Sequence, residues 1–163
     1  MTYKVGILVA SDSSYNGLRD DLCTPLMKEM ILKQTMDVIF TEVVSDDLEV
    51  IKEGLIKMSN MGCDLIFTSG GTGFSPRDNT PEATRSIIQK EANGIASAMI
   101  YNSLKYTPRA MLSRAVAGIY NSTLIINLPG SPKAVKENLE FLLPNLNHAL
   151  DVLGGNVKEC ATK

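Results

Sequence analysis

Four short apolar runs alternate along the chain with segments of helical periodicity, and this alternation limits the fold more than any other feature. The runs are Tyr3–Ala10, Asp37–Val44, Leu65–Phe67 and Thr123–Leu128. Strands that alternate with helices favour an α/β fold, here a three-layer α/β/α sandwich with a mostly parallel central sheet. Right-handed crossovers then bring the turns that follow these strands to one edge of the sheet. The length of 163 residues suits a single domain, 1–163, with 156–163 as a frayed polar tail.

Helices are expected where apolar residues recur every three or four places. The expected segments are Leu22–Gln34, Asp46–Met58, Thr80–Lys90, Ile95–Leu104, a short helix from Pro108 through Val116, and Ser131–Leu153. Asn93-Gly94 is expected to end the helix that begins at Thr80 or the connection after it. Pro144 is expected to break or restart the last helix.

The turn after the third run is rich in glycine. It reads Gly70-Gly71-Thr72-Gly73 and is followed by Arg77 and Asp78. Glycine lacks a Cβ atom, so its backbone adopts positive φ and lets an anion approach the N–H groups. The turn lacks the Gly-Lys-Ser/Thr ending of a P-loop, and Pro76 stands where a dinucleotide fingerprint needs its third glycine. Either this segment is a tight strand-to-helix turn without a ligand or, as the nearby charges favour, it binds an anion.

Two helix starts combine an N-cap hydroxyl with a proline at the first helical position. They are Thr80-Pro81 and Ser131-Pro132, the second directly after Pro129-Gly130. One anion-ready helix start is common, whereas two in a small domain indicate a ligand with phosphate at more than one point.

Short acidic and hydroxyl side chains follow the first two strands. Asp12, Ser13 and Asp21 follow the first strand, and Asp46 follows the second. Asp12 and Asp21 either accept hydrogen bonds within a turn or helix cap, or face a ligand. Asp46 forms a capping box with Glu49, faces a ligand, or does both. Because carboxylates repel a phosphate unless a cation intervenes, Mg²⁺ held by one or two of them is the expected cofactor.

Composition excludes several classes of function. The net charge of −2 provides no basic field for nucleic acid, and no apolar stretch approaches the roughly 20 residues that cross a membrane. Cys23, Cys63 and Cys160 show no metal-ligand spacing, which indicates free thiols in the cytoplasm. His148 is the only histidine, so no histidine-based triad can be assembled, and we expect it to be structural or exposed. Phosphate transfer by positioning and Mg²⁺ is the chemistry that this residue set supports.

Three motifs occur in order along the chain. They are GGTGFSPRDNTPEAT at 70–84, AMLSRAVAG at 110–118 and LPGSPKAV at 128–135. Together they resemble the molybdenum-cofactor biosynthesis family that includes the Mog and MoaB proteins and the G domains of gephyrin and of a plant homologue. The chain departs from this family at Ser13, where arginine is usual, and at Cys23-Thr24, where Ser-Gly is usual.

The resemblance implies Mg-ATP-dependent adenylylation of molybdopterin, with release of pyrophosphate. It implies that Asp46 and Asp78 are catalytic, by holding Mg²⁺ or orienting the triphosphate. The residues that it implies in binding ATP or molybdopterin are Ser13, Ser69, Gly70, Gly71, Thr72, Gly73, Arg77, Thr80, Ser113, Arg114, Gly130 and Ser131. It also implies a homotrimer and a molybdenum-insertase partner.

Alternatives remain open at this point. Arg77 contacts the ligand, or it pairs with Asp78 and only braces the loop. Ser113 and Arg114 contact the ligand or form an exposed helix end. The alternative function is a non-catalytic molybdopterin-binding protein, such as a MoaB-like carrier, and a third is a generic nucleotide-binding domain. The sequence leaves open whether the downstream metal is molybdenum or tungsten.

Overall fold

A six-stranded sheet forms the middle layer of the molecule. The structure, a computed structural model, describes residues 2–156. The strands are β1 (Tyr3–Ala10), β2 (Met36–Val44), β3 (Leu65–Ser69), β4 (Lys90–Glu91), β5 (Ala117–Tyr120) and β6 (Thr123–Leu128), in the order β2-β1-β3-β6-β5-β4. β2, β1, β3 and β6 are parallel, and β5 and β4 continue the sheet in antiparallel pairing.

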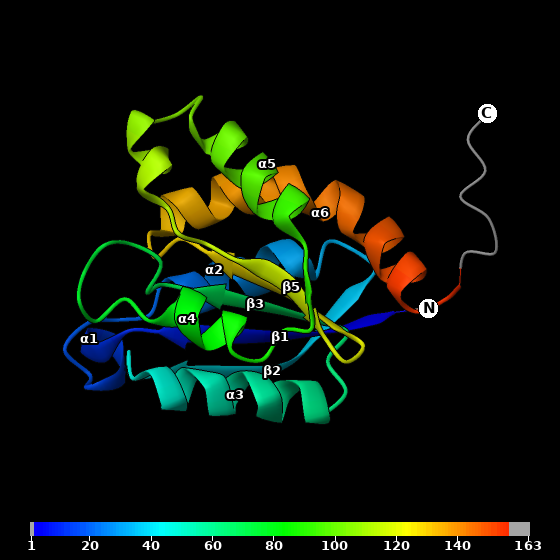
Figure 1. Ribbon diagram of the computed structural model, residues 1–163, viewed down its shortest axis with the longest axis horizontal. Coiled ribbons are helices and arrows are strands. Elements are labelled where there is room, and N and C mark those ends of the chain that lie inside the picture. The colour runs from blue at the N-terminus through cyan, green and yellow to red at the C-terminus, as the bar shows by residue number, and fades with distance from the viewer. Residues whose placement is uncertain (1, 157–163) are drawn as a thin grey trace.

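Helices cover both faces of this sheet (Figure 1). They are α1 (Asp12–Tyr15), α2 (Cys23–Ile31), α3 (Leu48–Asn60), α4 (Thr80–Arg85), α5 (Asn93–Ser103), the 3-10 helix η1 (Pro108–Leu112) and α6 (Pro132–Leu153). α3 and α4 pack on one face, and α2, α5 and α6 pack on the other. The predicted three-layer α/β/α sandwich with a mostly parallel sheet is confirmed. No helix within residues 2–156 is long and apolar enough to cross a membrane.

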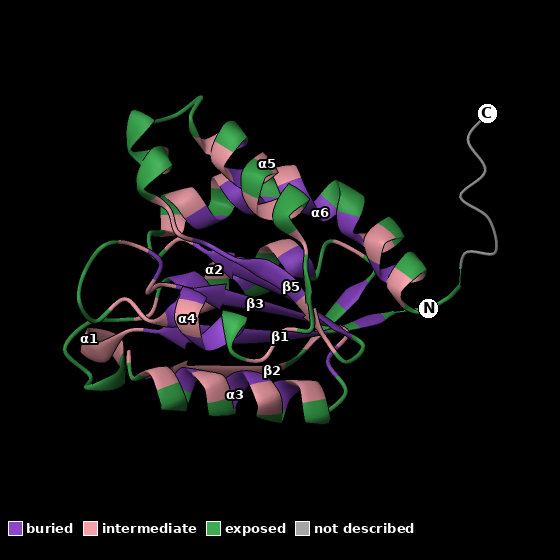
Figure 2. Cartoon of the chain, in the orientation of Figure 1, coloured by how far each residue is buried: buried purple, intermediate pink, exposed green. Residues whose placement is uncertain are grey.

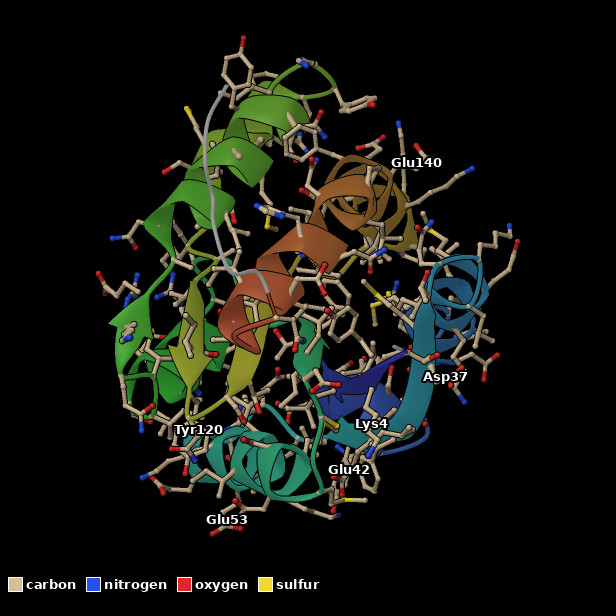
Figure 3. All side chains as sticks on the ribbon, turned by 90° about the vertical axis from the view of Figure 1, so that its right-hand side faces the viewer. Lys4, Asp37, Glu42, Glu53, Tyr120 and Glu140 are labelled. Atoms are coloured by element: carbon tan, nitrogen blue, oxygen red, sulfur yellow. The ribbon has the colours of Figure 1, made fainter. Side chains whose placement is uncertain are left out.

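The central strands are buried because helices lie on both sides of them (Figure 2). Phe67 belongs to the core shared with α2 and α6, whereas its neighbour Ile66 belongs to the core shared with α3. Each such side chain contributes about 1.5–3 kcal/mol when it is fully buried. Charged side chains lie on the outer faces of the helices, as Glu53 on α3 and Glu140 on α6 illustrate (Figure 3).

The helix that begins at Thr80 is shorter than the sequence predicted. α4 ends at Arg85 rather than Lys90, and Asn93 begins α5 rather than ending a helix. The intervening segment pairs with β5 instead, and the N–H of Gln89 donates to the carbonyl of Ile119 at 2.8 Å.

The predicted helix from Pro108 through Val116 is also wrong in its second half. η1 ends at Leu112, and the chain then runs extended into β5. The cause is Asn127 on β6, whose backbone N–H donates to the carbonyl of Val116 at 2.9 Å and whose Oδ1 accepts from the N–H of Val116 at 3.1 Å. Tertiary pairing therefore overrides local helical pattern here.

Pro144 does not break the last helix, because α6 runs through it without interruption. Leu143 and Leu146 are buried on either side of the proline, so packing against the sheet offsets the missing N–H. The predicted tail lies outside the described residues except for Asn156, as does Cys160.

Candidate active site

The carboxyl ends of β1, β2, β3 and β6 meet at one edge of the sheet around a cavity of about 290 Å³. Ser11 after β1 and Asp46 after β2 line it. Gly70 and Gly71 after β3 and Gly130 after β6 complete the wall opposite. The prediction that turns remote in sequence meet along a single edge is confirmed.

The turn at Gly70 and Gly71 can be formed only by glycine. Their φ angles are +91° and +66°, a region that favours glycine. A Cβ atom on Gly70 would lie 2.3 Å from the carbonyl oxygen of Ala10, and one on Gly71 would lie 2.4 Å from Oγ1 of Thr80. The N–H of Gly70 donates to the carbonyl of Leu128 at 3.3 Å, which ties the turn to β6.

Asp78 closes the loop that follows the glycine turn. Its Oδ2 accepts from the N–H of Ser75 at 3.0 Å, and its own N–H donates to the carbonyl of Ser75 at 2.9 Å. Asp78 and Asp46 both line the cavity. The two carboxylates that the family resemblance implied for magnesium therefore line the same cavity.

Asp46 is held by a partner other than the predicted one. The capping box with Glu49 is wrong, because α3 takes Asp47 as its N-cap and no side chain caps it. Instead, Oδ2 of Asp46 accepts from the N–H of Asp12 at 2.8 Å. Burial raises the pKa of Asp46, and the charges of Asp12 and Asp78 raise it further.

Arg77 does not pair with Asp78. Its guanidinium donates to both carboxylate oxygens of Asp12 at 2.9 Å and to Oδ1 of Asp47 at 2.7 Å. These hydrogen bonds raise the pKa of Arg77 and, together with the N–H of Asp46, lower that of Asp12. Arg77 thus joins the glycine loop to the ends of β1 and β2, and it does not line the cavity.

Thr80 is the first residue of α4 rather than its N-cap, which is Asn79. The side-chain amide of Asn79 donates to the carbonyl of Asp46 at 2.9 Å. It therefore links the start of α4 to the turn that follows β2. Thr80 is fully buried, and its N–H donates to the carbonyl of Gly71 at 3.1 Å. Its Oγ1 has no hydrogen-bond partner within residues 2–156. Thr80 therefore supports the glycine turn from behind.

Arg114 braces the same loop from the opposite side. Its guanidinium donates to the carbonyl of Gly73 at 2.7 Å and to that of Asp78 at 2.8 Å, and it pairs with Glu82. Its N–H donates to the carbonyl of Thr72 at 2.9 Å. The alternative of an exposed helix end is wrong, because these contacts keep the arginine half-buried.

A second cavity of about 260 Å³ lies on the other side of the glycine loop. Its lining combines residues of this loop with mostly apolar side chains from α5, η1 and α6, among them Thr72, Gly73, Met99, Ile100, Leu112, Ser113, Pro129 and Asn138. Ser113 thus lies in one cavity and Gly130 and Ser131 in the other. The glycine loop therefore contributes residues to both cavities.

The start of α6 forms as the sequence predicted. Oγ of Ser131 accepts from the N–H of Ala134 at 3.2 Å, and Pro132 is the first helical residue. Ser69, at the end of β3, donates its hydroxyl to the carbonyl of Pro129 at 2.8 Å. Ser69 and Ser131 both line the first cavity.

Comparison with known proteins places this geometry in a family. Residues 6–148 match the domain described as "Probable molybdopterin binding domain". The chain belongs to this family. Within the family, molybdopterin adenylyltransferase of Helicobacter pylori is 41% identical over 165 residues, which cover 99% of this chain and 94% of that protein.

Solved structures of the molybdopterin-binding-domain family share the fold. MoaB from Thermus thermophilus is 44% identical, with a TM-score of 0.89 over 94% of this chain and 98% of its own. The tungsten cofactor synthesizing protein MoaB from Pyrococcus furiosus is 30% identical, with a TM-score of 0.87 over 93% of this chain and 97% of its own. The family predicted from the three motifs is confirmed.

Ser13, where this chain departs from the family motif, lines neither cavity. Its hydroxyl lies 3.2 Å from Oγ of Ser11, within hydrogen-bond distance. Ser11 and Ser14 line the first cavity, although of the serines in this stretch only Ser13 was assigned to the site. The available signal was their position directly after a strand.

The loop between α1 and α2 and the first residue of α2 also line the first cavity, through Arg19, Asp20, Asp21 and Cys23. Of these four, only Asp21 was weighed as a residue that faces a ligand. Asp21 does serve the helix-start chemistry weighed for it. Its Oδ1 accepts from the N–H groups of Cys23 at 2.9 Å and Thr24 at 3.1 Å. Arg19 carried no signal, because no local pattern distinguishes it from an ordinary surface arginine.

Residues 2–156 contain no group of three His, Cys, Asp or Glu side chains that could hold a metal ion by themselves. His148 is exposed on α6, which is one of the two alternatives expected for this residue. Cys23 and Cys63 are buried free thiols, and burial raises the pKa of both, that of Cys63 to about 11.

Proposed function

We propose that the protein is a molybdopterin adenylyltransferase of molybdenum cofactor biosynthesis. An oxygen of the terminal phosphate of molybdopterin attacks the α-phosphorus of ATP, and the bond between that phosphorus and the bridging oxygen to the β-phosphate breaks. The products are adenylyl-molybdopterin and pyrophosphate. The observation that carries the proposal is the cavity that joins Asp46 and Asp78 to the glycine turn, in a chain 41% identical along its length to such an enzyme.

Backbone donors and carboxylates have separate tasks in this reaction. The N–H of Gly71 and the start of α6 at Ser131 are suited to phosphate oxygens. The attacking group is already a phosphate, so strong general-base help is not needed, and positioning carries much of the rate enhancement. Neighbouring residues of the glycine loop line the two cavities, which supports the binding of two substrates close to this loop.

Mg²⁺ is part of this proposal. Two carboxylates that face one cavity fit the ion, because it is typically held by one or two carboxylates together with substrate phosphates. Asp46 and Asp78 would hold it there. When bound, it neutralises charge on the phosphates.

The decisive experiment incubates the protein with molybdopterin and ATP labelled at the α-phosphate. We expect label to appear in the pterin with one pyrophosphate released per transfer, and chelation of Mg²⁺ to stop the reaction. A carrier would retain pterin without releasing pyrophosphate. A generic nucleotide-binding domain would bind ATP with an affinity that is indifferent to pterin.

We also propose that residues 1–163 form a single molybdopterin-binding domain that acts as a homotrimer in the cytoplasm and passes its product to a molybdenum insertase. Large apolar side chains exposed on and after α5 support self-association, namely Tyr101, Leu104, Tyr106, Met111 and Leu112. Buried free thiols at Cys23 and Cys63 support a reducing compartment. Sedimentation of a monomer at micromolar concentration would contradict the trimer.

A further inference from the structure

The first cavity carries an unbalanced charge. Four aspartates line it, namely Asp20, Asp21, Asp46 and Asp78. Among residues 2–156, the lining includes a single cationic side chain, that of Arg19. A phosphorylated ligand that enters this space therefore meets several carboxylates and one guanidinium, and the position of that guanidinium decides where a phosphate is attracted.

Arg77 and Arg114, the two arginines that hold the glycine loop in place, are already engaged. Arg77 is bonded to Asp12 and Asp47, and Arg114 is paired with Glu82 and bonded to two loop carbonyls. Within residues 2–156, Arg19 makes no ion pair or hydrogen bond. Its guanidinium is free to bind a ligand without first breaking a contact.

The charge of Arg19 also acts inside the cavity and not only at its rim. Cys23 lies in the cavity wall, and burial raises the pKa of its thiol. The charge of Arg19 opposes this rise by favouring the thiolate. An anion in the same cavity would experience the same attraction.

We propose that Arg19 binds a phosphate group of the substrate in this cavity, together with the backbone N–H of Gly71. The inference rests on the proposed function for the identity of the substrates, ATP and molybdopterin, either of which could supply the phosphate. The planar guanidinium donates two parallel hydrogen bonds to phosphate oxygens, which an ammonium group cannot do.

The test compares Arg19→Gln and Arg19→Lys with Lys28→Gln, a charge-matched control on exposed α2 surface outside both cavities. Calorimetry measures the binding of ATP, molybdopterin and inorganic pyrophosphate separately. For at least one of them we expect Arg19→Gln to weaken binding by about 10-fold or more and Arg19→Lys to restore part of it. The ligand that is weakened identifies the source of the phosphate, and the corresponding KM should rise with little change in kcat.

Binding of all three ligands within twofold of the wild type in Arg19→Gln would overturn the proposal, as would an equal loss in Lys28→Gln. Unfolding curves for the variants establish that each one is folded. Pyrophosphate binding requires no AMP transfer. One outcome separates the two proposals: the wild type transfers no AMP, yet Arg19→Gln binds pyrophosphate more weakly than the wild type does. This outcome would disprove the proposed function while leaving the role of Arg19 intact.

Discussion

Asp12 and Asp46 exchange two hydrogen bonds across the carboxyl ends of β1 and β2. The N–H of Asp12 donates to Oδ2 of Asp46 at 2.8 Å, and the N–H of Asp46 donates to Oδ1 of Asp12 at 2.9 Å. Arg77 then holds the Asp12 carboxylate from the glycine loop. The orientation of Asp46 in the cavity therefore depends on a residue that does not line it.

Asp12→Ala should destabilise the protein and lower its activity. The change removes the acceptor of the Asp46 N–H, and a partly buried donor without a partner costs about 1–2 kcal/mol. Asp12→Asn retains an oxygen for that N–H and should lose less in urea unfolding. Equal losses in the two variants would contradict a role for the exchanged pair of hydrogen bonds.

Asp46→Asn and Asp78→Asn should each lower AMP transfer by about 100-fold or more while the protein stays folded and still binds molybdopterin. Both carboxylates face the cavity, whereas Asp37 is an exposed residue of β2 at the outer side of the sheet (Figure 3). Asp37→Asn is thus the matched control and should transfer AMP at the wild-type rate. Normal transfer by either active-site variant would remove that residue from the mechanism.

Asp46→Asn should also make the protein more stable at neutral pH. Burial raises the folded-state pKa of Asp46 above 3.8, so the unfolded chain loses this proton first as pH rises, and ionisation then favours unfolding. Asparagine does not titrate and escapes this penalty. The stability gain over wild type should be full above the raised pKa and disappear below pH 3.8, as urea unfolding across pH would show.

Gly70→Ala should destabilise the protein more than Gly17→Ala. Both glycines have positive φ, which costs about 1–2 kcal/mol for alanine. A Cβ atom at Gly70 would also overlap the carbonyl of Ala10, whereas one at Gly17 would meet nothing within 4 Å. We expect Gly70→Ala to cost about 1–3 kcal/mol more in unfolding and to lose AMP transfer. Similar losses at the two sites would show that the close approach at Gly70 is unimportant.

The parallel half of the sheet was predictable because its strands are apolar runs bounded by turn residues, as in Thr123–Leu128. β5 was not, because Ala117–Tyr120 is short and follows a segment whose own pattern is helical. Its pairing depends on Asn127, a buried residue whose amide also donates to Thr68 and Thr84. No local pattern records such a long-range partner.

At the site, the sequence predicted which turns meet but not which side chains pair. The meeting follows from strand order, a rule that holds for parallel sheets in general. The partners of Arg77 and Arg114 depend instead on how loops lie in space, so the pairs with Asp12 and Glu82 could not be read from spacing. Ser131 was predictable, because an N-cap bonds within its own helix.

The contacts that shape the glycine turn bear on how the protein is made. The carbonyl of Leu128 accepts from the N–H of Gly70, and the guanidinium of Arg114 donates to the carbonyl of Gly73. Both partners come later in the sequence than the turn, so they are synthesised after it. A nascent chain interrupted before Leu128 would contain the glycine turn but lack the carbonyl that accepts from the N–H of Gly70.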